Sequence, residues 1–423
     1  MKLNLTALAT VVGLLLLMTG CTGTDTSKTE TPLNGTDETA SMIEDLDFLY
    51  DTLEKSHNDL YAVVSKDTLM AEKEQIAKDI PNMTDDAFYF SLKQLVARVG
   101  DAHTTVNYSD SVYKHLMAMP FAIEKYGDDW HIMMLDEYNE KYLGSKLKAI
   151  NDVSIEDIFE KAKAIISSEN EAWLTSQFSN TIAFKEALNY LGVVEGDTNI
   201  LLTVETLEGL EVTFPLAPLT ASTLTSTEIE VFEGETVAKT YPEGIYRALS
   251  LDEDTLFIQY NVCQESPDLP MATFTETIQK ELMDKPYTSV VLDLRYNTGG
   301  DAEVIRPMLD MIKAIKDEKS LEVYTFIGKN TFSSAVINAI QTKEELGGTL
   351  IGTATGGAVN GFGTMSAFDL KNHPFVVTYS TEYLELIEGY NKDALYPDVE
   401  VKQTLEDYIN GIDTEVNWLL NKQ

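Results

Sequence analysis

The sequence predicts a multidomain α/β protein with a layered α/β core, an N-terminal helical unit and an inserted α+β module. Three observations support this prediction. At 423 residues the chain is longer than one ordinary domain. Its hydrophobic content of 44% and aromatic content of 9% are those of a globular protein. Its second half alternates apolar strand patterns with helical patterns, which is typical of a core whose strands are largely parallel.

The charge of the chain limits its partners. The formal net charge is −38 at pH 7. Binding nucleic acid requires lysines and arginines that neutralise phosphates, and anionic membrane surfaces attract basic segments, so both kinds of partner are disfavoured. An acidic exterior that keeps the protein soluble is the simplest interpretation.

The first 40 residues precede the fold. Lys2 and an apolar run at 11–18 have the character of a signal peptide over residues 1–20, too short for a stable membrane anchor. The end of this segment, LMTGC, resembles the lipobox of bacterial lipoproteins, which implies cleavage before Cys21, lipidation of its thiol and an extracytoplasmic, lipid-anchored protein. A plain secretory signal with an incidental cysteine is the alternative. Residues 21–40 are rich in Thr, Gly and Asp, which predicts a disordered tether.

The sequence contains two cysteines, Cys21 and Cys263. If Cys21 carries a lipid, no intramolecular disulfide and no cysteine-based metal site is available. Cys263 ends an apolar strand pattern, so we expect a small buried hydrophobic side chain there.

The N-terminal helical unit is predicted at 41–104. Apolar residues at helical spacing favour helices at 42–53, 66–80 and 88–99. The third helix should stop at Gly100, so that the segment Asp101-Ala102-His103-Thr104 presents His103.

The inserted module is predicted at 105–218. Alternating apolar residues at 130–134 favour a strand, and a helix is expected at 154–166. Two further alternating runs, at 200–204 and 210–214, predict a hairpin.

The core is predicted at 219–423. Strands are expected at 256–260, 290–294, 323–327, 349–352 and 375–379, with helices at 274–282 and 302–312, from 334, and in part of 405–420.

The stretch SVVLDLRYNTGGD at 289–301 organises this core. Asp293 and Arg295 lie two positions apart in an apolar strand, and buried charges need partners, so we expect an internal ion-pair or hydrogen-bond network. Gly299 and Gly300 allow positive φ angles and expose amides that can stabilise an oxyanion or bind a phosphate. Ser334 lies between a strand and a helix, where a nucleophile benefits from the helix N-terminus, although a serine there is usually a simple N-cap.

Five motifs occur in the order of a known family: GDAHT at 100–104, VVLDLRYNTGG at 290–300, TFSSA at 331–335, TATGG at 353–357 and PDVEV at 397–401. Together they resemble the serine peptidases that include the C-terminal processing (tail-specific) proteases, the tricorn core protease and interphotoreceptor retinoid-binding protein. The resemblance implies a core of the tail-specific protease/crotonase-like type and a degenerate PDZ-like insert. It makes Ser334 the nucleophile, with the amides of Gly299 or Gly300 and Ala335 as the oxyanion hole.

One departure from the family pattern selects the general base. The processing proteases use a lysine near the threonine-glycine turn, but residues 355–360 contain none. The segment at 101–104 resembles the tricorn-like branch, whose base is a histidine, which implies His103. Glu382 is the best positional match for the group that orients this imidazole, and Asp101 is the local alternative. No metal and no cofactor is implied.

The resemblance predicts an exported, lipid-anchored serine endopeptidase acting on peptides or unfolded proteins. The alternative is a catalytically inactive lipoprotein of the same fold that binds a peptide or a small hydrophobic ligand, since fold alone does not determine function. A surface adhesion or scaffold protein is a third possibility.

Overall fold

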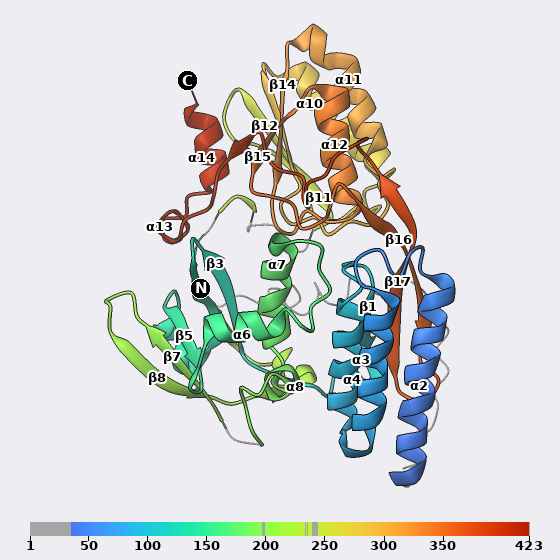
Figure 1. The fold of residues 1–423 in the computed structure, drawn as a ribbon. Coiled ribbons are helices and arrows are strands. Elements are labelled where there is room, and N and C mark those ends of the chain that lie inside the picture. The colour runs from blue at the N-terminus through green and yellow to red at the C-terminus, as the bar shows by residue number, and fades with distance from the viewer. Residues whose placement is uncertain (1–34, 197–198, 233, 235, 239–243, 423) are drawn as a thin grey trace. The chain divides into compact units, whose positions relative to one another are not determined.

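The computed structural model describes residues 35–196, 199–232, 234, 236–238 and 244–422 (Figure 1). The predicted signal peptide, Cys21 and most of the tether lie outside the described residues. The chain forms two compact units, each built from three stretches. Unit 1 holds the described residues up to Ser168, Gln177–Phe232 and Phe362–Leu384, and unit 2 holds Glu169–Ser176, the described part of Glu233–Gly361, and the chain from Glu385 onward. Within the described residues, no helix has the length and apolar character needed to cross a membrane.

Unit 2 is built on a six-stranded sheet in the order β11-β12-β13-β14-β15-β18. The first strand is antiparallel to the second, and the other neighbours are parallel. The central strands are short apolar runs that are buried on both faces, as expected for parallel strands covered on both sides. The strands are β11 (Tyr246–Ser250), β12 (Thr255–Tyr260), β13 (Ser289–Asp293), β14 (Glu322–Ile327), β15 (Thr349–Gly352) and β18 (Val399–Glu400).

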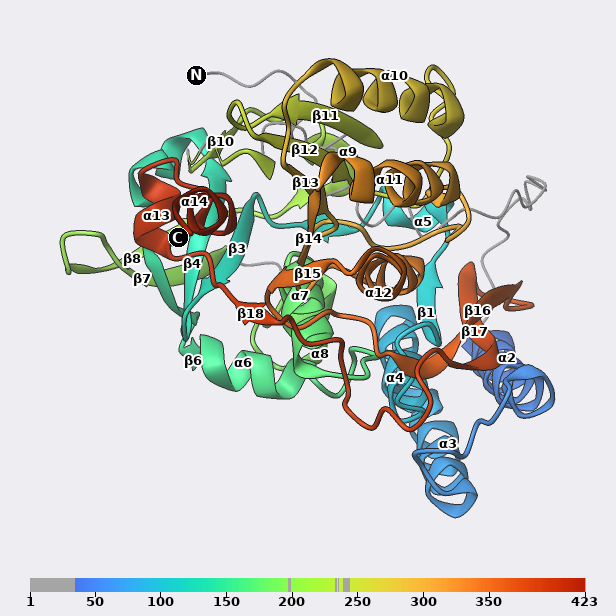
Figure 2. The ribbon, with the colours of Figure 1, turned by 90° about the horizontal axis from the view of Figure 1, so that it is seen from above.

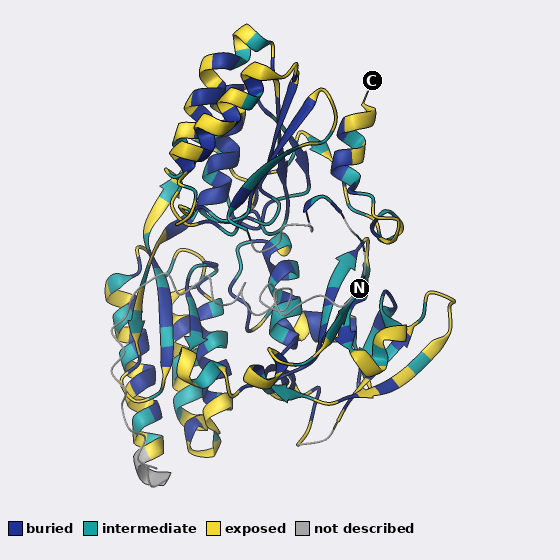
Figure 3. Cartoon of the chain, turned by 180° about the vertical axis from the view of Figure 1, so that it is seen from behind, coloured by how far each residue is buried: buried dark blue, intermediate teal, exposed yellow. Residues whose placement is uncertain are grey.

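Helices cover both faces of this sheet (Figures 1 and 2). On one face, α10 (Met271–Asp284), α11 (Arg306–Lys319) and α12 (Ser334–Leu346) pack against alternate strand residues such as Leu256 and Ile258. On the other face, Phe257, Val291 and Phe326 pack against Val416 and Leu419 of α14 (Thr414–Asn421), and the short helix α13 (Leu405–Ile409) precedes it. In Figure 3, most of this sheet has the colour of buried residues. The predicted α/β core is confirmed.

The internal ion network that was expected around Asp293 and Arg295 is present, and it also includes two carboxylates near the C-terminus. The guanidinium of Arg295 lies 2.8 Å from Asp293, 2.9 Å from Asp413 and 2.9 Å from Glu415. Burial opposes the charge of Asp413, but Arg295 holds the pKa of that carboxyl below its ordinary value. Burial raises the pKa of Glu415, and attraction to Arg295 offsets only part of this. The network therefore ties the start of α14 to the end of β13.

The N-terminal part of unit 1 combines helices with a small sheet. The predicted helices are confirmed, and Thr84 caps α4 by accepting a hydrogen bond from the amide of Ala87. Phe48 of α2 contacts Phe368, and Asp45 accepts hydrogen bonds from the turn at 371–373. The elements are α2 (Gly35–Ser56), α3 (Lys66–Asp79), η1 (Ile80–Asn82), α4 (Asp85–Ala97) and the strands β1 (Thr105–Tyr108), β17 (Phe375–Glu385) and β16 (Asn360–Asp369), in the order β1-β17-β16, with β1 and β17 antiparallel.

The inserted module contains a seven-stranded sheet in the order β10-β4-β5-β7-β8, in which β3 also pairs with β4 and β6 with β5. The predicted hairpin is formed by β7 and β8. The PDZ-like identity of this module and the domain boundaries remain predictions. Its elements are α5 (Asp110–Tyr113), β2 (Met117–Ala118), β3 (Phe121–Tyr126), β4 (Asp129–Asp136), η2 (Glu137–Tyr142), β5 (Lys146–Ile150), β6 (Val153–Ser154), α6 (Ile155–Ala162), α7 (Glu171–Ile182), α8 (Lys185–Tyr190), β7 (Ile200–Glu205), β8 (Glu211–Leu216), β9 (Leu219–Thr220), α9 (Ala221–Leu224) and β10 (Ile229–Val231).

Candidate active site

The turn between β14 and α12 holds two adjacent serines in different environments. Ser333 has φ 52° and ψ −125°, a conformation that a residue with a side chain rarely adopts, and it immediately precedes α12. Such strain between a strand and a helix is characteristic of nucleophilic serines, because the sharp turn projects the hydroxyl from the backbone. The side chain of Ser333 is partly accessible.

Ser334, the predicted nucleophile, begins α12 and is 9% exposed. Its hydroxyl donates a 2.6 Å hydrogen bond to the carbonyl oxygen of Gly300. That bond directs the Ser334 proton to a backbone carbonyl, which cannot serve as a general base. The geometry therefore favours Ser333 as the activated hydroxyl, although the role of Ser334 remains a prediction.

The predicted glycine turn adopts the backbone that its sequence indicated. Gly299 and Gly300 have φ angles of 106° and 130°. A Cβ atom on Gly300 would lie 2.3 Å from the carbonyl oxygen of Cys263, and one on Gly299 would lie 2.8 Å from the Cβ of Ser333. The Asp301 amide donates a hydrogen bond to the carbonyl oxygen of Cys263, and the Cys263 amide donates one to the carbonyl oxygen of Gly299. The turn is thus hydrogen-bonded to Cys263, in the segment that follows β12, and lies against Ser333.

The amides near the two serines are not equally available to a ligand. The Gly299 amide donates to Asn297 Oδ1 at 2.9 Å, and the Ala335 amide donates to the carbonyl oxygen of Phe332 at 3.0 Å. Among the described residues, the amides of Gly300 and Ser334 have no hydrogen-bond acceptor. The predicted pair of Gly300 or Gly299 with Ala335 remains a prediction, and the geometry favours Gly300 with Ser334. In hydrolases whose nucleophile lies on a strand-to-helix turn, the amide of the next residue helps to form the oxyanion hole. If Ser333 is the nucleophile, that amide belongs to Ser334.

Cys263 is 2% exposed and lies beside this turn. Its thiol lies 3.3 Å from the amide oxygens of Asn297 and Asn338. Burial raises the pKa of Cys263 to about 12, so the thiol is protonated at neutral pH. The expectation of a small buried side chain is confirmed.

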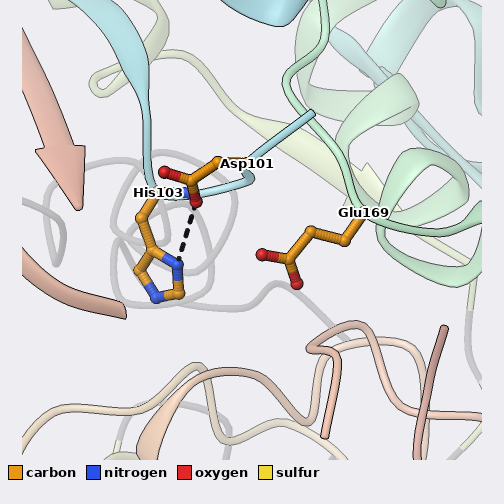
Figure 4. A group of neighbouring side chains, drawn as sticks. All are labelled: Asp101, His103 and Glu169. Atoms are coloured by element: carbon orange, nitrogen blue, oxygen red, sulfur yellow. Dashed lines mark hydrogen bonds and ion pairs between the residues drawn. The ribbon is translucent and has the colours of Figure 1, made fainter. Parts of the chain in front are cut away.

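In unit 1, Asp101 organises the loop that carries His103. Gly100, with φ 72°, follows the end of α4 and lets the chain turn. Asp101 Oδ1 accepts a 2.9 Å hydrogen bond from the backbone amide of His103 and lies 3.6 Å from its Nδ1 (Figure 4). Asp101 Oδ2 accepts hydrogen bonds from Thr104 Oγ1 and, at 3.2 Å, from His57 Nε2. The carboxylate therefore contacts both histidines.

These contacts determine the charge of Asp101. Burial alone would raise the pKa of Asp101, but hydrogen bonds from His103, His57 and Thr104 outweigh it and hold the pKa well below its ordinary value. The amide of Asp59 donates to His57 Nδ1 at 3.2 Å, so the proton of a neutral His57 lies on Nε2, which faces Asp101. His57 was not identified from the sequence, because it lies 44 positions before its partner and carries no local motif.

The two candidates for orienting His103 differ in environment. Asp101 is fully buried and touches His103 directly. Glu382 is exposed and accepts a 2.8 Å hydrogen bond from Thr364 Oγ1. The geometry favours Asp101, and the role of Glu382 remains a prediction. Glu169, also drawn in Figure 4, belongs to unit 2, where it accepts a hydrogen bond from the amide of Ala358.

No family model and no curated protein matches this sequence. Solved structures do match. CPAF complexed with lactacystin aligns with a TM-score of 0.64 and 12% identity, over 90% of this chain and 97% of that one. A mutant of CPAF aligns with a TM-score of 0.67 and 11% identity, over 90% and 96%. The photosystem II D1 C-terminal processing protease also matches, with a TM-score of 0.43 and 12% identity, over 88% and 98%. The chain therefore has the fold of CPAF, and the predicted fold class is confirmed.

Proposed function

We propose that this protein is an exported, lipid-anchored serine endopeptidase that hydrolyses peptide bonds in peptides or unfolded proteins. The observation that carries the proposal is the strained backbone of Ser333 at the N-terminus of α12, beside the amides of Gly300 and Ser334. A structural N-cap serine has no need of this strain, since ordinary caps lie in the extended region. A pre-formed pair of amides next to a strained serine favours acyl transfer.

The proposed mechanism is acyl transfer with a serine nucleophile and a histidine base. His103 accepts the proton of the Ser333 hydroxyl as its oxygen attacks the scissile carbonyl carbon. The amides of Gly300 and Ser334 stabilise the resulting oxyanion. His103 then donates the proton to the leaving amine, and water hydrolyses the acyl-enzyme by the same route. Asp101 holds the imidazole in position and stabilises its charged form, because its carboxylate is ionised at neutral pH.

A fluorophosphonate probe tests the nucleophile. The full-length protein in detergent is treated with the probe, and intact mass and peptide mapping locate the adduct. We expect one adduct in the wild type, none in Ser333→Ala, and strongly slowed labelling in His103→Ala. Ser334→Ala should still be labelled, because its hydroxyl is bonded to Gly300.

The other outcomes are equally informative. Labelling that survives in Ser333→Ala but not in Ser334→Ala would return the nucleophile to Ser334. A folded wild type that is never labelled, even with an unfolded protein present, would favour the inactive binding lipoprotein. The lipid anchor is tested separately, because Cys21→Ala should release the protein from membranes if the lipobox interpretation is correct.

A further inference from the structure

The segment Glu169–Ser176 lies within the predicted insert, yet it packs in unit 2. Asn170 precedes α7 and caps it by accepting a 2.9 Å hydrogen bond from the amide of Trp173. The Asn170 side-chain amide donates to the carbonyl oxygens of Gly356, at 3.0 Å, and Asp393, at 2.9 Å. One buried side chain therefore joins the start of α7 to the threonine-glycine turn at 353–357.

Trp173 carries the next contact. Its ring stacks on Phe332, with ring centroids 4.0 Å apart and an interplanar angle of 15°. Phe332 immediately precedes Ser333, and its amide donates to the carbonyl oxygen of Asn297. The indole also lies against Gly356, where an added Cβ atom would be 2.8 Å from the ring. Trp173 therefore contacts both Phe332, the residue before Ser333, and Gly356 of the threonine-glycine turn.

A third contact lies one helical turn further along. The hydroxyl of Ser176 donates to Asn330 Oδ1, in the loop between β14 and α12. Trp173 and Ser176 are three positions apart and therefore lie on the same face of α7. This face contacts the loop that contains Ser333 at two points, Phe332 and Asn330.

We propose that Trp173 is a positioning residue that holds Ser333 in its strained conformation by stacking on Phe332. This inference rests on the proposed function and adds to it a residue outside the five sequence motifs. Strained backbone persists only where the surroundings over-determine it, and displacing a reacting group by about 1 Å can cost about a hundredfold in rate. The stack on Phe332, the Ser176 contact and the Asn170 cap supply that constraint.

The same helix also enters unit 1. From Gln177 onward α7 belongs to that unit, where Phe178 contacts the rings of Trp130 and Phe159, with centroids 4.8 and 5.0 Å away. The Ser179 hydroxyl donates to the carbonyl oxygen of Ile123 at 2.8 Å. Helix α7 therefore begins in unit 2 and continues in unit 1, and each part makes its contacts within its own unit.

The test is the saturation kinetics of fluorophosphonate labelling on the full-length protein. For Trp173→Ala we expect the maximal labelling rate to fall at least about tenfold, while the probe concentration at half-maximal rate changes less than about threefold. Trp173→Phe should restore the rate to within about threefold of the wild type. Trp418→Ala removes a partly buried tryptophan of α14 that packs against the cluster of Phe257 and Phe326; it is the control and should label normally.

A double-mutant cycle identifies the route. If Trp173 acts through Phe332, then Phe332→Leu combined with Trp173→Ala should lose no more rate than the worse single variant. A folded Trp173→Ala variant labelled at the wild-type rate would overturn the proposal while leaving the serine peptidase intact.

Two further outcomes complete the test. Should Trp173→Ala fail to fold, Trp173→Leu and Trp173→Phe replace it as the test of the positioning role. Labelling of both variants at the wild-type rate would overturn the proposal, because leucine cannot stack on Phe332. No labelling of the wild type would instead refute the proposed function on which the inference rests.

Discussion

Replacing Asp101 by asparagine tests the loop that carries His103. The carboxylate is fully buried and accepts hydrogen bonds from His103, His57 and Thr104. Asparagine can keep the acceptor that faces His103, but its amide nitrogen then faces the Nε2 proton of His57. That ring cannot exchange its proton, because the Asp59 amide already donates to Nδ1. One buried donor is left unpaired, and the charge-assisted bonds are lost.

The magnitude follows from these losses. An unsatisfied buried donor costs about 1–3 kcal/mol, and a hydrogen bond to a charged group contributes about 1.5–3 kcal/mol. We therefore expect Asp101→Asn to lower the free energy of unfolding by about 3 kcal/mol at pH 7. Asp129→Asn is the matched control, because its carboxylate is 43% exposed and pairs with Lys146 at the surface, so the loss should be about 1 kcal/mol or less.

The effect should depend on pH with a definite sign. The pKa of Asp101 is lowered in the folded protein, so its contribution is fully present above the unfolded pKa of about 4 and is lost as the pH falls toward the folded value. The difference between wild type and Asp101→Asn in urea unfolding should therefore shrink between pH 7 and pH 3. A difference below about 1 kcal/mol at pH 7, or one that does not change with pH, would refute the reasoning.

Two further predictions concern unit 2. Gly300→Ala should lower the free energy of unfolding by about 3 kcal/mol, because it combines backbone strain at φ 130° with a clash against Cys263. Its control, Gly411→Ala, has φ 70° and no atom within 4 Å of the added Cβ, so the loss in the same urea assay should be only about 1–2 kcal/mol. Arg295→Met should cost about 3–5 kcal/mol by leaving three buried carboxyls without a cation, and hydrogen exchange should accelerate in α14. Its cost should be smaller at pH 5 than at pH 8, since protonated carboxyls need no partner; equal costs would argue against the network.

Much of the fold was predictable because local patterns and tertiary structure agree there. The parallel strands of unit 2 are apolar runs bounded by turns, and their assignment is confirmed. The helix expected from Ala302 begins only at Arg306, because residues 302–304 form a turn and Pro307 suits the first helical turn. Strand β16, with glycines and exposed polar residues, was missed because its order comes from pairing with β17.

The candidate site divides in the same way. The glycine turn was identified because only glycine fits φ angles of 106° and 130°. The sequence could not separate Ser333 from Ser334, since no local residue pattern indicates which of two adjacent serines takes a positive φ angle. Helix α7 and its Trp173 were missed because the partners of Trp173 lie more than 150 positions later.

The interleaving of the two units has a consequence for biosynthesis. The small sheet of unit 1 places β17 between β1 and β16, so the strand next to His103 is supplied by residues 375–385 of a 423-residue chain. Neither unit is a continuous piece of chain that can be completed while the rest is still being made. Pairings between such distant segments form slowly, because a long loop must close first. Residues 101–104 therefore acquire their final surroundings only after nearly the whole polypeptide has been synthesised.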